Sequence, residues 1–297
     1  MDQASKLRSA IIKKNSYKAE QLRSDIQDKE PRVICVSSGK GGVGKSNFTL
    51  NLALSLRKKG HKVTIIDADL GLANIEILLG ITPKLGLLDL TKNNINIEDV
   101  IVDGPLGIQI ISGGAGISEV VDLPLNELNK ILNSIYLLKE KTDFILIDTG
   151  AGISKSVMSF LSASDEVIVV ITPEPTAVTD GYALIKVAIR EDSNKKINLV
   201  VNKCEDENEA LFAYEKIKIA SKKFLNFDVG YLGYICNDKN VQMSVKSQIP
   251  FYINAPNSTA TNNIDEISNK ILGTEKSEGI FNSFIKKLSN FFLSGRG

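Results

Sequence analysis

Residues 39–46 form a glycine-rich loop that ends in a lysine and a serine, Gly-Lys-Gly-Gly-Val-Gly-Lys-Ser. An apolar run at 33–36 precedes the loop and a helical pattern at 47–58 follows it, which is the context that a phosphate-binding loop needs. Its backbone N–H groups can surround phosphate oxygens beside the positive end of a helix dipole. We therefore predict a nucleoside triphosphate site, with Lys45 on the β- and γ-phosphates and Ser46 on Mg²⁺. The residues predicted to hold the nucleotide through this loop are Gly39, Lys40, Gly41, Gly42, Val43, Gly44, Lys45 and Ser46.

Two aspartates, Asp67 and Asp69, follow an apolar run at 62–66. Beside a phosphate loop, such carboxylates can orient a Mg²⁺-bound water or position the water that attacks the γ-phosphate. Asp and Asn also favour turns and helix caps, so a turn that starts the next helix is the alternative interpretation. The nearby loop favours the role in hydrolysis.

A third aspartate, Asp148, follows the apolar run at 144–147 and precedes the sequence Thr-Gly-Ala-Gly. An aspartate at this place is expected to anchor Mg²⁺ through a water molecule. Gly150 and Gly152 allow the backbone to approach the γ-phosphate and to move once that phosphate leaves. The alternative is an aspartate in an ordinary turn at the end of a strand.

Asn202 and Lys203 come directly after the apolar run at 197–201. The asparagine amide can pair with the edge of a purine base, although an asparagine that merely starts a turn is the alternative. Glu205 stands where an aspartate would indicate guanine, and its longer side chain weakens that preference without excluding it. Asn202 is therefore predicted to contact the base.

The elements that must position these residues alternate between apolar runs and helical patterns from about residue 33 to 272. Near-continuous apolar strands separated by helices predict an α/β fold, with a mostly parallel doubly wound sheet and helices on both faces. The carboxyl ends of parallel strands meet at one edge, where ligands bind. The predicted strands span 33–36, 62–66, 108–111, 144–147, 166–171, 197–201 and 229–235, and predicted helices include 47–58, 123–138 and 207–224.

The composition limits the classes of partner. A formal net charge of +1 gives no attraction of the whole molecule to nucleic acid or lipid, and nucleic acid is not an expected partner. Three cysteines without metal-ligand spacing predict reduced thiols in a cytoplasmic protein. No run reaches the roughly 18–20 apolar residues that a membrane-spanning helix needs, and the first residues do not resemble a signal peptide.

The loop resembles the signature of the MinD/ParA group of deviant-Walker ATPases, because its second lysine, Lys40, stands where most phosphate-binding loops have none. The segments 67–69, 148–152 and 172–181 strengthen the resemblance, which covers about residues 31–272. It implies a P-loop NTPase fold, ATP and Mg²⁺ as cofactors, and slow hydrolysis to ADP and phosphate. It also implies a homodimer that ATP closes.

The resemblance further implies a role for each site residue. Lys40 of one subunit would reach the phosphates held by the other, where a second ammonium group neutralises the charge of the γ-phosphate. Asp69 would position the attacking water, and Asn202 would read adenine. Gly150 departs from the Pro or Ala often found at its place, which leaves the course of that loop open. The implied catalytic residues are Lys40, Lys45 and Asp69, and the implied metal ligands are Ser46, Asp67 and Asp148.

Residues 1–30 are polar and are predicted to form a separate partner-binding segment. Their start is similar to the motif of the FlhG subgroup of flagellar-number regulators (also called FleN or YlxH), which stimulates a GTPase of the FlhF type. A helical start capped by an aspartate is the alternative. The residues that match the motif are Asp2, Gln3, Ala4, Leu7 and Arg8.

The C-terminal region is predicted to contain a polar hinge at 273–278 and an amphipathic helix at 279–297. Lysines but no acidic residues accompany the apolar stripe of this helix, which suits a lipid interface. The alternative is that the stripe packs on the protein's own core, and both arrangements can follow each other if ATP releases the helix. The residues predicted to contact lipid are Phe281, Phe284, Ile285, Leu288, Phe291 and Phe292.

These observations predict an ATP-dependent dimerising switch that associates with the cytoplasmic face of the membrane and regulates flagella through an FlhF-type GTPase. Alternatives are a MinD-type protein for division-site placement and a ParA-type protein for DNA segregation. The latter would bind DNA through a lysine cluster at 216–223. A GTP-using switch and an adaptor without hydrolysis are further alternatives. An iron–sulfur scaffold would need a paired-cysteine motif, which the sequence lacks.

Overall fold

The computed structural model describes residues 30–69, 74–113, 123–274 and 280–294. Within these residues a single sheet has the strand order β3-β4-β2-β5-β1-β6-β7-β8. Neighbouring strands are parallel, except that β3 and β4 are antiparallel. The strands are β1 Arg32–Ser38, β2 Val63–Ala68, β3 Ile101–Asp103, β4 Gln109–Ser112, β5 Phe144–Ala151, β6 Glu166–Ile171, β7 Lys196–Cys204 and β8 Gly230–Cys236.

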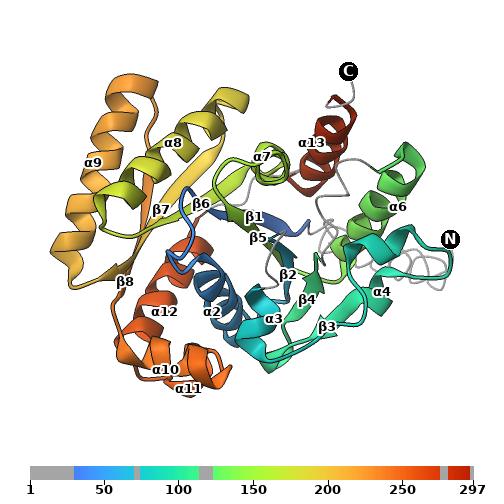
Figure 1. Cartoon of the computed structure of the whole chain (residues 1–297), viewed down its shortest axis with the longest axis horizontal. Helices are drawn as coiled ribbons and strands as arrows, with labels where there is room; N and C mark the ends of the chain where they lie inside the picture. Colours follow the sequence, from blue (N-terminus) through green and yellow to red (C-terminus); the bar gives the residue numbers. More distant parts are fainter. Residues whose placement is uncertain (1–29, 70–73, 114–122, 275–279, 295–297) are drawn as a thin grey trace, which may run out of the picture.

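Helices connect the strands and cover both faces of the sheet (Figure 1). The α-helices are α2 Lys45–Lys58, α3 Asn74–Leu79, α4 Ile97–Val100, α6 Leu125–Tyr136, α7 Lys155–Ala163, α8 Pro175–Glu191, α9 Glu207–Leu225, α10 Lys239–Ser247, α11 Phe251–Asn254, α12 Thr259–Leu272 and α13 Ile280–Ser294. The 3₁₀ helices are η1 Leu87–Thr91, η2 Pro105–Gly107 and η3 Leu137–Glu140.

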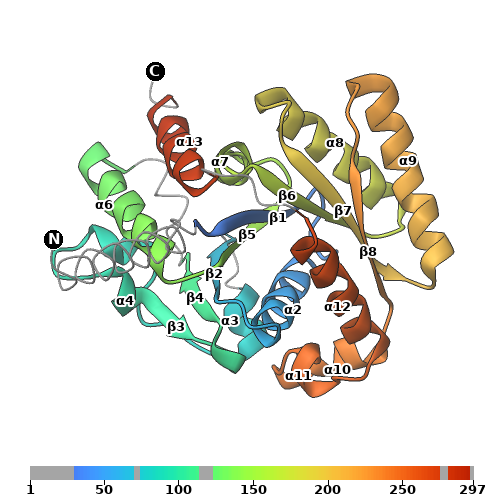
Figure 2. The ribbon, with the colours of Figure 1, turned by 180° about the vertical axis from the view of Figure 1, so that it is seen from behind.

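The sheet separates two hydrophobic cores. Side chains of α2, α11 and α12 form the core on one face, and those of α6, α7, α8, α9 and α13 form the core on the other. The central strand β1 contributes to both, because successive side chains of a strand point to opposite faces. Val33 and Cys35 lie in one core, and Ile34 and Val36 lie in the other. The view from behind shows the same two layers (Figure 2).

The predicted mostly parallel α/β fold is confirmed, and each predicted strand overlaps an observed one. The sequence missed β3, which has 3 residues and pairs with β4 at the edge of the sheet. So short a segment gives too little alternation of apolar and polar residues to be recognised. The helical pattern at 123–138 corresponds to α6 followed by η3, and the pattern at 207–224 corresponds to α9.

The C-terminal helix α13 is docked on the domain. Its apolar stripe enters the core on the face of α6 and α7, where Phe281, Phe284, Leu288 and Phe292 are each at most 4% exposed. Lys287 Nζ lies 2.6 Å from Asp165 Oδ1 and 3.0 Å from Asp192 Oδ2, so ion pairs also hold the helix. The backbone N–H of Phe281 donates to Glu30 (3.1 Å). In this arrangement the predicted lipid-binding side chains form part of the core, with Ile285 and Phe291 partly buried against it.

The segment before α13 begins at the amino edge of the sheet. Buried Arg32, at the start of β1, pairs with Glu166 at the start of β6. Its guanidinium also donates to the carbonyl of Ile271 and to Thr274 Oγ1 (2.7 Å). The end of α12 is therefore fixed to the sheet. The predicted motif Asp2, Gln3, Ala4, Leu7 and Arg8 and most of the predicted hinge lie outside the described residues.

None of the helices in the described part of the chain has the length and apolar character to cross a membrane.

Candidate functional site

The glycine-rich loop joins the carboxyl end of β1 to the first turn of α2. Close neighbours explain two of its glycines. A Cβ atom at Gly39 would collide with the carbonyl oxygen of Asp180 in α8, and one at Gly44 would collide with Asn202 Nδ2. Gly44 also has a φ of 90°, which favours glycine. The loop is thus held between α8 and the end of β7, with its central residues Gly41 and Gly42 exposed.

Lys45 is directed to the interior of the site. Its Nζ atom lies 3.1 Å from Asp148 Oδ1, and both side chains are buried. Thr49, one turn further along α2, donates to the same carboxylate oxygen (3.2 Å). Burial raises the pKa of Asp148, and the charge of Lys45 opposes that rise. Thr49 was not predicted as a site residue, although its spacing of four residues from Lys45 places both on one face of the helix.

Asp67 lies beside Asp148, since the two residues are partners in the register of β2 and β5. Its carboxylate accepts the backbone N–H groups of Asp69 (3.1 Å) and Ile75 (3.1 Å). Burial, followed by the negative charge of Asp148, raises the pKa of Asp67 to about 7. Two buried carboxylates side by side repel each other, and a cation between them would relieve that repulsion.

The chemistry of this pair fits Mg²⁺. The second oxygen of Asp148, Oδ2, is buried and has no hydrogen-bond partner among the described residues. Ser46 is the second residue of α2, next to Lys45, and is partly exposed. No cluster of three or more His, Cys, Asp or Glu side chains in the described ranges could hold a metal by itself. Mg²⁺ commonly binds through one or two protein groups together with waters and phosphate oxygens, and Ser46, Asp67 and Asp148 are the groups that could hold it here.

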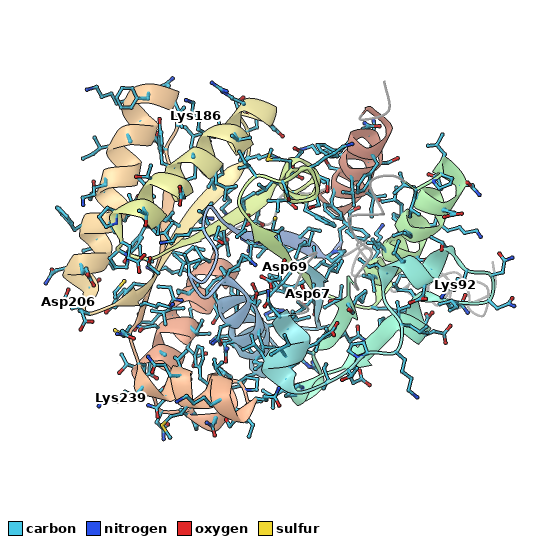
Figure 3. All side chains as sticks on the ribbon, viewed as in Figure 1. Asp67, Asp69, Lys92, Lys186, Asp206 and Lys239 are labelled. Atoms are coloured by element: carbon cyan, nitrogen blue, oxygen red, sulfur yellow. The ribbon has the colours of Figure 1, made fainter. Side chains whose placement is uncertain are left out.

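Asp69 lies at the rim of the site and not in its interior. Its Oδ2 atom accepts a hydrogen bond from Asn74 Nδ2 (2.8 Å), which fixes the carboxylate at the start of α3. A Cβ atom at Gly150 would lie 3.3 Å from Asp69 Oδ1, so the two segments approach closely where their strands end. Figure 3 shows Asp67 and Asp69 near each other in the middle of the molecule, beside α2 and α3. Residues 70–73 are outside the described ranges.

Lys40 is separated from this interior cluster. Its Nζ atom lies 3.1 Å from Glu174 Oε2 and 3.0 Å from Thr176 Oγ1, at the N-terminus of α8. The side chain is 42% exposed and that of Glu174 is 64% exposed. The two lysines of the loop therefore have different partners, and Lys40 does not complete the cluster of its own chain. The sequence did not identify Glu174 or Thr176 as partners of this lysine.

Asn202 and Lys203 support the loop from the end of β7. Asn202 Nδ2 donates to the carbonyl of Val43 (2.7 Å), and Lys203 Nζ donates to the carbonyl of Gly42 (2.8 Å). Lys203 has a φ of 59°, an uncommon value for a residue with a side chain. Because these two carbonyls are held toward β7, the loop has a fixed orientation before any nucleotide binds. This supporting role was not anticipated from the sequence.

A cavity of about 470 Å³ adjoins the loop on the side of Asn202. Its wall includes Gly44 and Asn47 from the loop and α2, and residues of α10 and of the segment after β8. Glu205, which stands where an aspartate would indicate guanine, does not line this cavity. Asn237 and Asp238, which do line it, follow a predicted strand in the same way as the other site residues and could have been found by that rule. The lining residues are Gly44, Asn47, Phe48, Asn202, Lys203, Ile235, Cys236, Asn237, Asp238, Val241, Gln242, Val245, Lys246 and Phe251.

The geometry can be compared with known proteins. The family model ParA, described as an NUBPL iron-transfer P-loop NTPase, matches residues 29–272. Antiactivator FleN of Pseudomonas aeruginosa is 35% identical over 240 residues, which cover 81% of this chain and 86% of FleN. Flagellum site-determining protein YlxH of Helicobacter pylori is 33% identical over 276 residues, which cover 88% of this chain and 90% of YlxH.

A solved structure of a relative holds a nucleotide. The septum site-determining protein MinD from Pyrococcus horikoshii, complexed with Mg-ADP, aligns with a TM-score of 0.67 and 27% identity. The alignment covers 84% of this chain and 98% of that protein. The fold is thus shared with a protein known in a complex with Mg-ADP.

Proposed function

The chain belongs to the ParA family of P-loop NTPases and is an ATPase, and we propose that it is a dimerising, membrane-associating switch that sets the number and placement of flagella. ATP closes two copies against each other, and slow hydrolysis separates them. Mg²⁺ supplies charge neutralisation at the phosphates when bound. Of the chain's own residues, Lys45 orients the phosphates and Asp69 positions the attacking water.

One observation carries the dimer proposal: Lys40 is exposed and held by Glu174 and Thr176, away from the buried pair of Lys45 and Asp148. Because the Lys40 ammonium group does not reach the nucleotide site of its own chain, it can contact the nucleotide bound by a second copy. When two copies face each other at the carboxyl edge of the sheet, the Lys40 ammonium group exchanges Glu174 for the partner's γ-phosphate. The site is then complete only in the dimer.

Sedimentation of an Asp69→Ala variant tests this proposal. Without the water-positioning carboxylate the variant should hydrolyse ATP far more slowly and accumulate as a dimer with ATP, while ADP leaves it monomeric. The additional change Lys40→Ala should return the ATP-bound variant to the monomer. An Asp69→Ala protein that binds ATP and stays monomeric at micromolar concentrations contradicts the dimer switch.

The ATP-dependent part of membrane association requires the release of α13. In the docked state, Phe281, Phe284, Leu288 and Phe292 are buried in the core, and Lys287 is paired with two carboxylates. These side chains are therefore not available to contact lipid. Released, it is an amphipathic helix with lysines and no acidic side chains, suited to an anionic interface. We infer that the ATP-bound dimer favours the released state.

Vesicle sedimentation tests the release. ATP should increase the fraction of protein on vesicles that contain phosphatidylglycerol, and deletion of residues 279–297 should abolish that increase. Because deletion uncovers part of the core, the double variant Ile285→Ser/Phe291→Ser serves as a second test at partly buried positions. If the wild type, the deletion variant and the double variant each bind vesicles equally with and without ATP, α13 is not released by ATP.

The proposed target is a GTPase of the FlhF type, contacted through Asp2, Gln3, Ala4, Leu7 and Arg8. The relatives FleN, an antiactivator, and YlxH, a flagellum site-determining protein, support a flagellar role. A peptide of residues 1–29 should stimulate GTP hydrolysis by the partner, and Leu7→Ala/Arg8→Ala should abolish this effect. Stimulation that is unchanged by these substitutions contradicts the assignment.

The proposed base is adenine. Asn202 lines the cavity, and its amide keeps a second N–H for a purine beside the one that it donates to Val43, whereas Glu205 does not line the cavity. ATP should therefore displace a bound fluorescent nucleotide at much lower concentration than GTP does. Equal competition would favour the alternative of a switch that uses GTP.

A further inference from the structure

Helix α9 exposes large apolar side chains, Phe212 and Ile219 on its outer face and Phe224 in its last turn. Phe212 and Phe224 are each 66% exposed and Ile219 is 63% exposed. The opposite face of the same helix packs against the sheet through Ala213 and Ile217, which are at most 2% exposed. Transfer of these exposed side chains into an apolar environment would be favourable, and clustered exposed apolar groups commonly mark a contact surface.

Lysines surround these apolar side chains. Lys216 Nζ lies 4.1 Å from the ring centroid of Phe212, and Lys223 Nζ lies 5.2 Å from that of Phe224. Neither of these two lysines forms an ion pair with a carboxylate in the described part of the chain, whereas the nearby Lys218 pairs with Glu215. Each exposed aromatic ring therefore carries an ammonium group whose charge is not neutralised. We call Phe212, Lys216, Ile219, Lys223 and Phe224 the α9 ridge.

The position of α9 leaves this ridge open to a large, flat partner. The helix is the outermost element at its end of the molecule in both views (Figures 1 and 2). It connects parallel β7 to β8, so its C-terminal turn, with Lys223 and Phe224, lies toward the amino edge of the sheet. Thr274, where the chain leaves α12 for α13, is fixed near that edge by Arg32.

From these observations we propose that the α9 ridge is a second membrane-binding surface, which inserts its apolar side chains into an anionic lipid bilayer. Its lysines, which have no carboxylate partner within the described ranges, are attracted to the negative charge of the lipid headgroups. Its phenylalanines can insert into the boundary between the headgroups and the acyl chains. A nucleic acid would use the lysines and leave Ile219 exposed to water. The ridge is exposed while α13 is docked, so this contact exists without nucleotide and does not depend on the release of α13.

Vesicle sedimentation of the full chain without nucleotide tests the ridge. Wild-type protein should bind vesicles of phosphatidylglycerol and phosphatidylcholine, and it should bind pure phosphatidylcholine more weakly. Phe212→Ser/Phe224→Ser should lower the partition coefficient by about tenfold or more, because two exposed rings no longer enter the interface. Lys216→Glu/Lys223→Glu should lower it by about tenfold or more on the anionic vesicles only.

The matched control is Met243→Ser/Ile249→Ser, which removes two exposed apolar side chains from the segment of α10, away from the ridge. It should bind like the wild type, and all variants should keep the wild-type melting temperature because the substituted side chains are exposed. Unchanged vesicle binding in the phenylalanine variant overturns the proposal. So does a lysine variant that loses retention of double-stranded DNA but keeps vesicle binding, which would assign the ridge to nucleic acid.

The same experiment with ATP separates this inference from the switch. An increase in binding caused by ATP belongs to α13 and should persist in the ridge variants. Loss of binding without nucleotide belongs to the ridge and can be observed even if ATP has no effect.

Discussion

The two lysines of the phosphate loop lie five positions apart and have opposite surroundings. Lys45 is buried and paired with Asp148, which is fully buried, whereas Lys40 is exposed and paired with Glu174, which is more exposed still. A buried ion pair is costly to break, because the remaining charge has neither water nor a partner. An exposed pair contributes little, because water can replace either partner.

The difference in burial indicates that the pair of Lys45 and Asp148 is a permanent part of the site, whereas the pair of Lys40 and Glu174 can be exchanged for another partner. Lys45 is committed to the site of its own chain before nucleotide binds. Lys40 can leave Glu174 at small cost, as an element that changes partner must. Lys287 of α13 lies between these cases, since it is about one-third exposed and paired with two carboxylates.

The largest expected effect is that of Lys45→Met. The variant should bind ATP about 10- to 100-fold more weakly, because a charge-assisted contact with the phosphates is lost. It should also unfold at lower denaturant concentration, because Asp148 is left buried without its cation. Calorimetric titration and urea unfolding measure the two effects. A variant with wild-type affinity for ATP would remove the distinction between the two lysines.

The next effect is that of Lys40→Ala. Nucleotide affinity of the monomer should stay within about threefold of the wild type, since the residue does not contact its own site, while turnover falls by about 100-fold or more. Lys40→Arg keeps the charge with a different geometry and serves as the control. Steady-state hydrolysis over a series of protein concentrations measures turnover. Unchanged turnover, together with unchanged sedimentation in ATP, would contradict the proposal that Lys40 contacts the phosphate bound by the partner subunit.

A smaller effect, in the opposite direction, is expected for Glu174→Gln. The substitution removes the carboxylate that competes with the partner's phosphate for Lys40, and an exposed pair of this kind contributes about 0.2–1 kcal/mol. The ATP-dependent dimer should therefore form at a protein concentration lower by about two- to fivefold. Thr176→Val, which removes only the neutral contact, should have less effect. A dimer weakened by Glu174→Gln would show that Glu174 acts in the dimer itself.

The smallest effect concerns the pH dependence of α13 docking. Burial acts to raise the pKa of Asp192, but the backbone N–H of Asn194 and the Lys287 ammonium group outweigh it and hold that pKa below its ordinary value. A lowered carboxyl pKa stabilises the folded state above the ordinary pKa of 3.8, and this contribution is lost as the pH falls through the folded-state value.

The variant Lys287→Met keeps the part of this contribution that comes from Asn194 but lacks the part that comes from Lys287 at every pH. The difference in unfolding free energy between wild type and variant should therefore shrink as the pH falls below about 4. Urea unfolding at a series of pH values measures it. A difference that stays constant down to low pH would show that the pair with Asp192 does not hold the helix.

Several parts of the site were accessible from the sequence because each depends on a local rule. Polar residues that follow apolar strands, such as Asp67, Asp148 and Asn202, were expected at one edge of the sheet, and the structure places them there. Asp69 was expected with them and lies at the rim, bound to Asn74. Contacts between segments far apart in the chain, such as that of Lys40 with Glu174, leave no local pattern and were missed.

The helices α13 and α9 show the same limit. Both carry phenylalanines and lysines, and spacing alone predicted an apolar stripe for α13 without deciding whether it contacts lipid or core. The structure buries the stripe of α13 and exposes the phenylalanines of α9. Periodicity describes the face of one helix, whereas burial depends on what lies opposite that face.

The sequence alone determined the class of fold, the phosphate loop and the carboxylates around it, because backbone preferences and the spacing of apolar residues act over a few positions. The tertiary structure decided which partner each lysine has, which face of each helix is exposed, and that α13 is docked. Those properties arise from packing between distant segments, and the free energy of each contact depends on water being excluded from it.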